Sequence, residues 1–271
     1  MTCKLKIGIA GFGTVGNAVK CIMEKKHEIL IYDKFKESGL IFDLLNTDIV
    51  FITVPTPFCE ISKSIDLGAV NEIVKYLSDN QYSGLTIIKS TCIPGTSAKL
   101  ANKFKDLSIV FNPEFLREVT AVEDFKNQDN IVFGVNKDLS QEELKRLETL
   151  YEGVVNNFNI QNVSIVSYES AELIKYAQNV MLGSRITTCN IIYDACEKLG
   201  ASYEEVKKIA FYRGELIGDK VVEVPGHDGK RGFGGKCLPK DISAFNSTFD
   251  SKVLEEILKY NSKIRYKDEN R

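Results

Sequence analysis

Histidine is scarce in this chain of 271 residues, which contains only His27 and His227. Few histidines are therefore available for a His-rich metal site or a Ser-His-Asp triad, and we expect no metal site. The seven cysteines are scattered and include no C-x-x-C pair. An odd number of isolated cysteines favours free thiols in a reducing compartment, which predicts a cytoplasmic protein.

Strong net charge and long apolar segments are also absent. The formal net charge is −2, so no strong field would attract nucleic acid or an anionic membrane. No apolar run reaches the length of a bilayer span, and glycines interrupt the apolar N-terminal stretch, which predicts a strand rather than a signal peptide. The composition, 44% hydrophobic and 27% charged, is typical of a soluble protein with one large domain or two ordinary ones.

A glycine-rich turn follows the first predicted strand, residues 4–10. It has the G-x-G-x-x-G pattern and consists of Gly11, Phe12, Gly13, Thr14, Val15 and Gly16. A helical pattern follows, and then a second strand that ends on Asp33. Such glycines let a pyrophosphate pass closely, and a carboxylate about 20 residues further on receives the ribose hydroxyls of NAD. Taken alone, the glycines would also fit a helix that packs tightly on a strand. Together with the strand before them, the helix after them and Asp33, they predict NAD binding. Lys34 and Lys36 leave NADP as an alternative, although Asp33 would repel its 2′-phosphate.

Strands and helices alternate over the rest of the N-terminal part. Further strands are predicted at 48–54, 85–90, 107–111, 131–135 and 163–166, with a helix at 67–77. This alternation predicts an α/β fold, a Rossmann-type doubly wound parallel sheet over residues 1–167, which binds ligands beyond the carboxyl ends of its strands. Thr56, Thr91 and Asn112 follow predicted strands and are candidates by position, although such residues are more often plain turn residues.

The second part, residues 168–271, is predicted to be a mainly helical domain with a long central helix over 168–199. Shorter helices are predicted at 203–211, 239–246 and 252–264, and the tail from residue 267 is expected to fray. Glu172, Lys175 and Asn179 share one face of the long helix. That face is either solvated, which the residues alone favour, or a polar cluster buried against the cofactor domain.

The segment from Arg231 to Asp241 reads Arg-Gly-Phe-Gly-Gly-Lys-Cys-Leu-Pro-Lys-Asp. A proline two residues after Cys237 is well placed for the first turn of a helix, so the cysteine would lie at a helix N-terminus between Lys236 and Lys240. These features favour a thiolate. The alternative is a buried cysteine that acts as a small hydrophobic residue.

Five separated segments, taken in order, resemble the UDP-glucose/GDP-mannose dehydrogenase family, most closely its UDP-glucose dehydrogenase branch. They are the glycine turn with Asp33, Ser90-Thr91-x-x-Pro94-Gly95-Thr96, Asn112-Pro-Glu-Phe-Leu-Arg-Glu118, Ala171-Glu172-x-x-Lys175-x-x-x-Asn179, and Gly226-x-x-x-x-Arg-Gly-Phe-Gly-Gly-x-Cys-Leu-Pro-Lys-Asp241. The third and fifth are highly specific. The resemblance implies oxidation of the C6 alcohol of a nucleotide sugar, with UDP-glucose as the best single guess, to a carboxylate with reduction of two NAD.

The resemblance also implies a role for each candidate residue. Catalysis would use Cys237 as nucleophile, Glu118 as base in thioester hydrolysis with Glu114 assisting, Lys175 and Asn179 as oxyanion donors, and Thr91 and Asp241 to order the water and the lysine. NAD would contact the glycine turn, Asp33, Lys34, Thr56, Thr91, Glu118 and Lys240. The nucleotide sugar would contact Phe115, Leu116, Lys175, Asn179, Lys230, Arg231, Gly232, Phe233, Gly234, Gly235 and Cys237. By themselves, Glu114 and Glu118 are typical of a helix that starts after a proline.

Three departures from the family pattern are visible. The chain ends soon after the cysteine motif, which predicts that the family's third, C-terminal nucleotide-binding domain is lacking. Leu216 stands where an arginine that reaches the sugar nucleotide is expected, and Arg213, Lys220, Lys230 or Arg231 could replace it. Val119 replaces a usual glycine, and Ile191 replaces a common glutamate.

Two other functions stay open. A hydroxyacid dehydrogenase needs one hydride transfer and no cysteine, so it would leave Cys237 unexplained. A non-catalytic or partner-dependent NAD-binding protein would fit Leu216 and the missing domain, but would leave the set of catalytic side chains unexplained.

The long helix predicts a homodimer, because it carries apolar residues on more than one face. They are Leu173, Ile174, Met181, Leu182, Ile186 and Ile192. A two-domain monomer would struggle to cover them, and exposed apolar surface of this kind usually marks an interface. The loop over 222–235 would hold the diphosphate with Lys230, Arg231 and backbone N–H groups of its glycines, namely Gly226, Gly229, Gly232, Gly234 and Gly235.

Overall fold

The computed structural model describes residues 4–36, 38–136, 139–156, 158–159, 161, 163–211, 223–249 and 251–269. The chain divides into two compact units. The first, the sheet unit, comprises Met1–Pro57 and Ile65–Lys175, and the second, the cysteine unit, comprises Phe58–Ser64 and Tyr176–Arg271. None of the described helices is long and apolar enough to cross a membrane.

Seven strands of the described chain form the central sheet of the sheet unit, in the order β2-β1-β3-β6-β7-β8-β9. Their bounds are Lys6–Ala10 (β1), Glu28–Tyr32 (β2), Ile49–Ile52 (β3), Leu85–Ile88 (β6), Ser108–Phe111 (β7), Ile131–Val135 (β8) and Val163–Ser167 (β9). The first five strands in this order pair in parallel. The doubly wound α/β sheet predicted from the alternating pattern is confirmed.

The sheet is mixed rather than parallel throughout, because β8 pairs with β7 in the antiparallel sense, Phe111 opposite Gly134. β9 then pairs in parallel with β8. The connection from β7 to β8 contains the 3₁₀ helix η2 (Glu118–Thr120) and the helix α4 (Ala121–Lys126). Because β8 runs antiparallel to β7, the chain enters β8 at the edge of the sheet where β7 ends.

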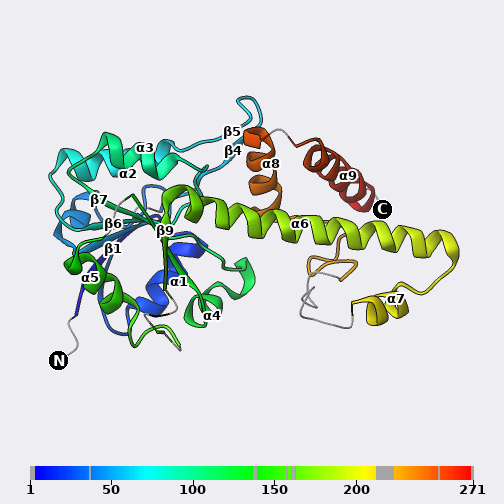
Figure 1. Ribbon diagram of the computed structural model, residues 1–271, viewed down its shortest axis with the longest axis horizontal. Coiled ribbons are helices and arrows are strands. Elements are labelled where there is room, and N and C mark those ends of the chain that lie inside the picture. The colour runs from blue at the N-terminus through cyan, green and yellow to red at the C-terminus, as the bar shows by residue number, and fades with distance from the viewer. Residues whose placement is uncertain are drawn as a thin grey trace. The chain divides into compact units, whose positions relative to one another are not determined.

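Helices cover both faces of the sheet, which explains why every residue of the central strands β3 and β6 is buried. Figure 1 shows α1 (Thr14–Met23), α4 and α5 (Gln141–Tyr151) on one side, and α2 (Gly68–Asp79) and α3 (Thr96–Lys103) on the other. The 3₁₀ helix η1 (Ile41–Asn46) contributes Leu44 to the core under α2 and α3. Successive residues of β3 point to opposite faces, since Phe51 joins the core under α1 while Val50 and Ile52 join the other.

The long helix α6 (Tyr168–Leu199) has the predicted bounds, and its first eight residues belong to the sheet unit. The other helices of the cysteine unit are α7 (Tyr203–Ala210), α8 (Leu238–Phe249) and α9 (Lys252–Glu269). A Cβ atom on Gly183 would lie 2.1 Å from Ile242, so this glycine lets α8 pack closely on α6. The tail predicted to fray from residue 267 instead continues α9 to Glu269. The short strands β4 (Phe58–Cys59) and β5 (Ser64–Ile65) were not predicted, because two-residue strands leave no periodic pattern.

Candidate active site

The glycine turn after β1 is tightly packed on one side and open on the other. Gly11 has a φ of 94°, and a Cβ atom there would lie 2.8 Å from the backbone of Thr53. A Cβ atom on Gly16 would lie 2.2 Å from the carbonyl oxygen of Gly11. At Gly13, by contrast, a Cβ atom would meet nothing within 4 Å, and α1 begins at the next residue, Thr14. The open side thus lies at a helix N-terminus, where backbone N–H groups and the helix dipole favour an anion.

Asp33 follows β2 and is fixed by the turns around it. Its carboxylate accepts hydrogen bonds from the backbone N–H of Phe12 (2.6 Å), Phe35 (2.9 Å) and Lys36 (3.0 Å). Burial raises the pKa of Asp33, but these three donors outweigh it and hold the pKa below its usual range. The carboxylate is therefore ionised at neutral pH and oriented at the edge of the glycine turn.

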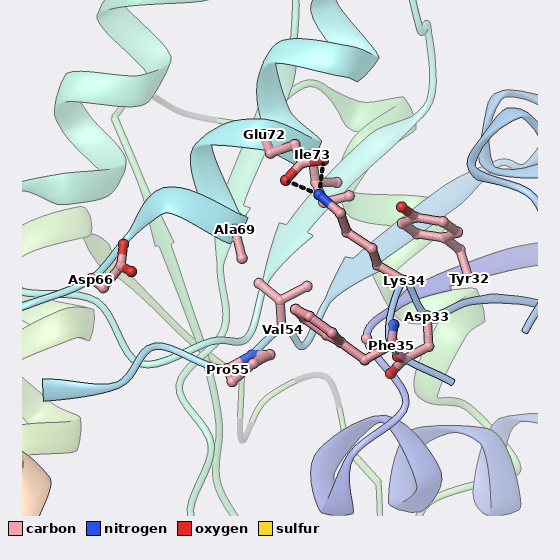
Figure 2. Close-up of a pocket in the computed structure, with 11 residues that line it drawn as sticks. Tyr32, Asp33, Lys34, Phe35, Val54, Pro55, Asp66, Ala69, Glu72 and Ile73 are labelled. Atoms are coloured by element: carbon pink, nitrogen blue, oxygen red, sulfur yellow. Dashed lines mark hydrogen bonds and ion pairs between the residues drawn. The ribbon is translucent and has the colours of Figure 1, made fainter. Parts of the chain in front are cut away.

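A cavity of about 250 Å³ opens beside Asp33. Figure 2 shows it between the loops after β2 and β3 and the first turns of α2. Its lining consists of Gly11, Tyr32, Asp33, Lys34, Phe35, Val54, Pro55, Asp66, Ala69, Glu72 and Ile73. Apolar side chains together with the fixed carboxylate of Asp33 suit a flat heterocycle joined to a ribose. The cradle at Gly13, Asp33 and this cavity together fit the adenosine and pyrophosphate of a dinucleotide.

The two lysines that left NADP as an alternative are both engaged. Lys34 Nζ donates to both carboxylate oxygens of Glu72, at 2.9 and 3.2 Å, and the two side chains meet at the cavity wall in Figure 2. Lys36 Nζ donates to the carbonyl oxygen of Phe12 at 2.5 Å and lies 5.5 Å from the centre of its ring. Three carboxylates, Asp33, Asp66 and Glu72, thus line the cavity, whereas a 2′-phosphate would require cations there.

Thr56 and Thr91, which were candidates by position, lie together beyond β3 and β6. Thr56 is buried, and its hydroxyl donates to the carbonyl oxygen of Thr91 at 2.9 Å. The preceding Ser90 hydroxyl donates to the carbonyl oxygen of Val54 at 2.7 Å. These bonds tie the two strand-end loops to each other at the ligand-binding edge of the sheet.

The segment after β7 carries a buried ion pair. Glu114 is buried, and its carboxylate lies 3.2 Å from Nζ of Lys175 on α6. Lys175 itself is only 4% exposed. The same carboxylate accepts a hydrogen bond from the backbone N–H of Leu116. The solvated face that the residues alone favoured for Lys175 is therefore wrong. The helix start considered for Glu114 and Glu118 is also wrong, because residues 112–117 are irregular and η2 begins only at Glu118.

Around this pair, Phe115 and Leu116 are half-buried, whereas Glu118 is exposed. Arg117 anchors the end of the segment through Asp124, which accepts from its backbone N–H at 2.9 Å and from its Nε at 3.0 Å. The guanidinium holds the pKa of Asp124 at about 2. Glu118 is therefore presented to solvent next to a fixed point of the backbone.

In the cysteine unit, Cys237 is exposed and directly precedes α8. The predicted position at a helix N-terminus is confirmed, and the buried alternative is wrong. One turn into α8, the fully buried Asp241 accepts a hydrogen bond from Nδ2 of Asn179 on α6, and Lys240 Nζ lies 3.0 Å from its other oxygen. Asn179 is 7% exposed, so it also does not lie on a solvated face.

The glycine-rich loop before Cys237 differs from the expected diphosphate cradle, because three of its five glycine N–H groups are used within the unit. Gly226 donates to the carbonyl oxygen of Lys230 at 2.9 Å, Gly229 donates to that of Gly226 at 2.9 Å, and Gly232 donates to Oδ1 of Asn190 at 3.3 Å. Of the five glycines, only Gly234 and Gly235 have N–H groups without such a bond in the described part of the chain. These two therefore remain the candidates for contact with a diphosphate. A loop this tight needs these internal bonds to satisfy its backbone.

Arg231 is held against α6 rather than directed freely at a ligand. Its guanidinium lies 2.5 Å from the carboxylate of Asp194 and stacks 4.8 Å from the ring centre of Tyr193. The hydroxyl of Tyr260 on α9 donates to the same Asp194. These contacts neutralise the charge that was expected to bind a diphosphate.

Two residues on α9 support the loop, and no motif in the sequence pointed to either of them. Asn261 on α9 is buried, accepts from the N–H of Phe233 at 2.8 Å and donates to its carbonyl oxygen at 2.9 Å. Arg265, one turn further, donates to the carbonyl oxygen of Gly232 at 3.4 Å and pairs with Asp228 at 2.8 Å. In the sheet unit, Glu172 accepts from the N–H groups of Gly95 and Ser97 and so caps α3. A polar residue within an apolar helical stripe is the one sequence signal these supports share.

Several expectations concern residues outside the described part of the chain. They are the Gly214–Gly218 segment with Leu216 in the place of the expected arginine, the possible substitutes Arg213 and Lys220, Val222 at the start of the loop, and the side chain of Ile191. Val119, which replaces a usual glycine, is described and is exposed.

Comparison with known proteins agrees with this architecture. Residues 22–155 match the NAD binding domain of the UDP-glucose/GDP-mannose dehydrogenase family, and residues 169–264 match its central domain. The fold and the site define a class of dehydrogenases built on an NAD-binding sheet. Within it, the chain belongs to the UDP-glucose/GDP-mannose dehydrogenase family.

Individual relatives show how much of the family is present. The chain is 36% identical over 247 residues to a UDP-glucose 6-dehydrogenase of Rickettsia bellii, a match that covers 87% of this chain and 53% of the relative. A solved UDP-glucose dehydrogenase of Pyrobaculum islandicum superimposes with a TM-score of 0.79 at 25% identity, covering 98% of this chain and 68% of that one. A UDP-D-ManNAc dehydrogenase of Pyrococcus horikoshii, at 18% identity and a TM-score of 0.76 over 96% and 68% of the chains, shares the fold. The chain spans about half the length of the curated relatives it matches.

Proposed function

We propose that this chain carries out the four-electron, NAD-dependent oxidation of a nucleotide sugar, UDP-glucose or a relative of it, to the uronic acid. The observation that carries the proposal is the exposed Cys237 at the start of α8, next to the buried Asn179–Asp241 pair. A hydroxyacid dehydrogenase would have no use for this thiol. Membership of a family of nucleotide-sugar dehydrogenases supports the same reaction.

The sheet unit would hold the cofactor. The glycine turn and the N-terminus of α1 would receive the pyrophosphate, and the ionised Asp33 would accept hydrogen bonds from the ribose hydroxyls. When bound, NAD would accept one hydride in each of two successive oxidations. Asp33 and Glu72, both at the cavity, favour NAD over NADP because they would repel a 2′-phosphate.

Cys237 would be the nucleophile. In the first oxidation the C6 alcohol becomes an aldehyde, and the cysteine sulfur then bonds to the aldehyde carbon to give a thiohemiacetal. In the second oxidation the thiohemiacetal carbon loses a hydride and its hydroxyl a proton, which gives a thioester on the same sulfur. Its place directly before α8 would favour the thiolate form that this attack requires.

Lys175 and Asn179 would stabilise the oxyanion that forms at C6. Both are buried and lie one turn apart on α6, so they are fixed before the reaction starts. Glu114 orients the ammonium of Lys175, and Asp241 orients the amide of Asn179. A preorganised donor of this kind contributes about 10²–10³ in rate.

Water would finally hydrolyse the thioester, with Glu118 as the base. Its exposed carboxylate, next to the anchored Arg117, can accept a proton from water, and Glu114 would assist. Thr91, at the ligand-binding edge of the sheet, would order the water. Breaking the carbon–sulfur bond then returns the thiol and releases the carboxylate.

The stoichiometry of the reaction tests this function. Purified protein given NAD and UDP-glucose should form two NADH per sugar consumed and release the uronic acid, which absorbance and mass spectrometry quantify. One NADH with a free aldehyde or ketone as product would instead indicate a hydroxyacid type of reaction. Binding of NADH without any turnover of nucleotide sugars would favour the non-catalytic, NAD-binding alternative.

We also propose that the protein is a homodimer that associates through α6. On this helix Leu173, Ile174 and Met181 are exposed, Met181 to 55%. Ile186 and Ile192, by contrast, are partly buried within the cysteine unit. Light scattering should give twice the chain mass for the wild type, and Met181→Glu should shift it toward the monomer. A wild-type monomer that is fully active at high dilution would contradict the dimer.

A further inference from the structure

Lys89 is a buried lysine at the end of β6 that the proposed mechanism does not use. It is 3% exposed, and its backbone N–H donates to the carbonyl oxygen of Ile52 at 2.9 Å, which fixes it at the ligand-binding edge of the sheet. Burial of an ammonium group is costly unless it is paired and hydrogen-bonded. A lysine in this position therefore calls for a specific role.

The ammonium of Lys89 lies under the turn that leads to Glu114. Nζ donates to Oδ1 of Asn112 at 2.8 Å and to the carbonyl oxygen of Pro113 at 3.3 Å. Oδ1 of Asn112 also accepts from the hydroxyl of Tyr151 at 2.9 Å. Lys89 and Tyr151 thus hold the same amide oxygen, but of the two only Lys89 also holds the carbonyl that directly precedes Glu114.

The charges around Lys89 form one buried cluster of two ammonium groups and one carboxylate. Burial lowers the pKa of Lys89 to about 8, the carboxylate of Glu114 opposes that shift, and the ammonium of Lys175 adds to it. Glu114 in turn pairs with Lys175. A change at Lys89 therefore acts on the ion pair through both the backbone of the turn and the local field.

We propose that Lys89 is a positioning residue, which holds the Asn112–Pro113 turn and so places the Glu114 carboxylate against Lys175. The inference rests on the proposed function. Without the ammonium, the buried carbonyl of Pro113 loses its donor and the turn is free to shift. A displacement of about 1 Å in a catalytic group costs about 10²-fold in rate.

The test compares Lys89→Met with Tyr151→Phe, because both remove one hydrogen bond to the same oxygen of Asn112. In Lys89→Met, kcat should fall about 10²-fold, with little change in the Kd of NADH. A sugar adduct on Cys237 should accumulate and be visible in the intact mass, since Glu114 assists hydrolysis. Tyr151→Phe should lose less than about 10-fold in kcat and show no adduct. Equal losses in the two variants, or normal turnover in Lys89→Met, would overturn the proposal.

A second variant covers the case in which Lys89→Met does not fold, and a second measurement, hydrogen exchange, does not depend on turnover. Lys89→Gln retains a donor without the charge and replaces Lys89→Met if that variant does not fold. Hydrogen exchange should show faster exchange at the amide of Leu116, which donates to Glu114, with no change in α3. Unchanged exchange at Leu116 would contradict the positioning role. If the wild type forms no NADH, the proposed function fails, and this exchange measurement still decides the role of Lys89.

Discussion

The two compact units fix their candidate residues by different means. In the sheet unit, Asp33 lies directly beyond the parallel strand β2, and backbone N–H groups hold its carboxylate. In the cysteine unit, a loop without regular structure precedes Cys237, and side chains from two helices hold it: Asn190 from α6, and Asn261 from α9. The N–H groups that hold Asp33 lie 2, 3 and 21 positions away in the sequence, whereas the side chains that hold the loop lie 28 and 42 positions away.

This difference predicts how each unit responds to substitution. Where backbone groups set the site, as around the glycine turn and Asp33, single side chains can change without moving their neighbours, but glycines in close contact cannot. Where side chains hold a loop, loss of one of them leaves buried backbone groups unsatisfied and releases the loop. The following substitutions separate the two cases, from the largest expected effect to the smallest.

The largest effect is expected for Cys237→Ala. Without the thiol, formation of the uronic acid should fall by more than about 10³-fold, because no thioester can form. Binding of NADH should be unchanged, since every proposed NAD contact except Lys240 lies in the sheet unit. NADH fluorescence titration and product analysis measure the two properties separately. Full activity in Cys237→Ala would reject the assigned nucleophile.

Asn261→Ala tests the side-chain support of the loop. The change leaves the buried N–H and carbonyl of Phe233 without partners, which costs about 1–3 kcal/mol for each group. We expect a lower melting temperature and faster alkylation of Cys237 by iodoacetamide, because the loop before it is released. Asn80→Ala, which removes one exposed bond to Tyr76, is the matched control. If the two variants melt alike, Asn261 does not support the loop.

Gly16→Ala and Gly13→Ala separate packing from ligand binding in the glycine turn. The methyl group at Gly16 would overlap the carbonyl oxygen of Gly11, and such overpacking costs about 1–3 kcal/mol. The methyl group at Gly13 meets no protein atom within 4 Å and should leave the melting temperature almost unchanged. It should nevertheless weaken NADH binding about 10-fold or more, because the pyrophosphate passes there. Normal NADH binding by Gly13→Ala would place the pyrophosphate elsewhere.

Cofactor choice gives a smaller, graded effect. Asp33→Ser removes the carboxylate that would repel a 2′-phosphate, and Glu72→Gln releases Lys34 from its ion pair. Each change should move the ratio of NADPH to NADH affinity toward NADPH, and the double variant should exceed either, because only it provides both space and a cation. Binding titrations with both cofactors measure the ratio. A wild type without preference would show that these two carboxylates do not select NAD.

The smallest effect concerns pH and His27, which is buried between β1 and α5. Its Nδ1 accepts from the N–H of Leu5 at 3.2 Å and its Nε2 lies 3.1 Å from the carbonyl oxygen of Leu150, an arrangement that fits the neutral ring. Burial lowers the pKa of His27 below that in the unfolded chain, although the Leu150 carbonyl opposes it. The unfolded state then binds the additional proton, so stability is complete above about pH 6.5 and declines as the pH falls below it.

Melting temperatures at about pH 7.5 and about pH 5.5 measure this dependence. His27→Gln should be less sensitive to acid than the wild type by a few degrees. His227→Gln, a change at the exposed histidine, should behave like the wild type. An identical acid response in all three proteins would exclude His27 as its source.

Much of the sheet unit could be predicted from the sequence, because its signals are short-range. Runs of buried residues at β1, β3 and β6, the glycine turn and the spacing to Asp33 each lie within a few dozen residues. The long helix α6 could also be predicted, because its helical pattern runs from residue 168 to residue 199, the bounds that the structure shows. The antiparallel entry of β8 could not be predicted, since the direction of a strand depends on the length and path of its connection.

The sequence by itself determined which residues are candidates for the proposed chemistry and that Cys237 stands at a helix start. Only the tertiary structure decided what surrounds them: that Lys175 and Asn179 are buried and paired, that Arg231 is taken up by Asp194, and that Lys89 lies under the turn before Glu114. The physical reason is that burial and charge pairing are properties of residues brought together from distant parts of the chain. A motif records the type and spacing of a side chain, but the fold sets its dielectric environment and its partners.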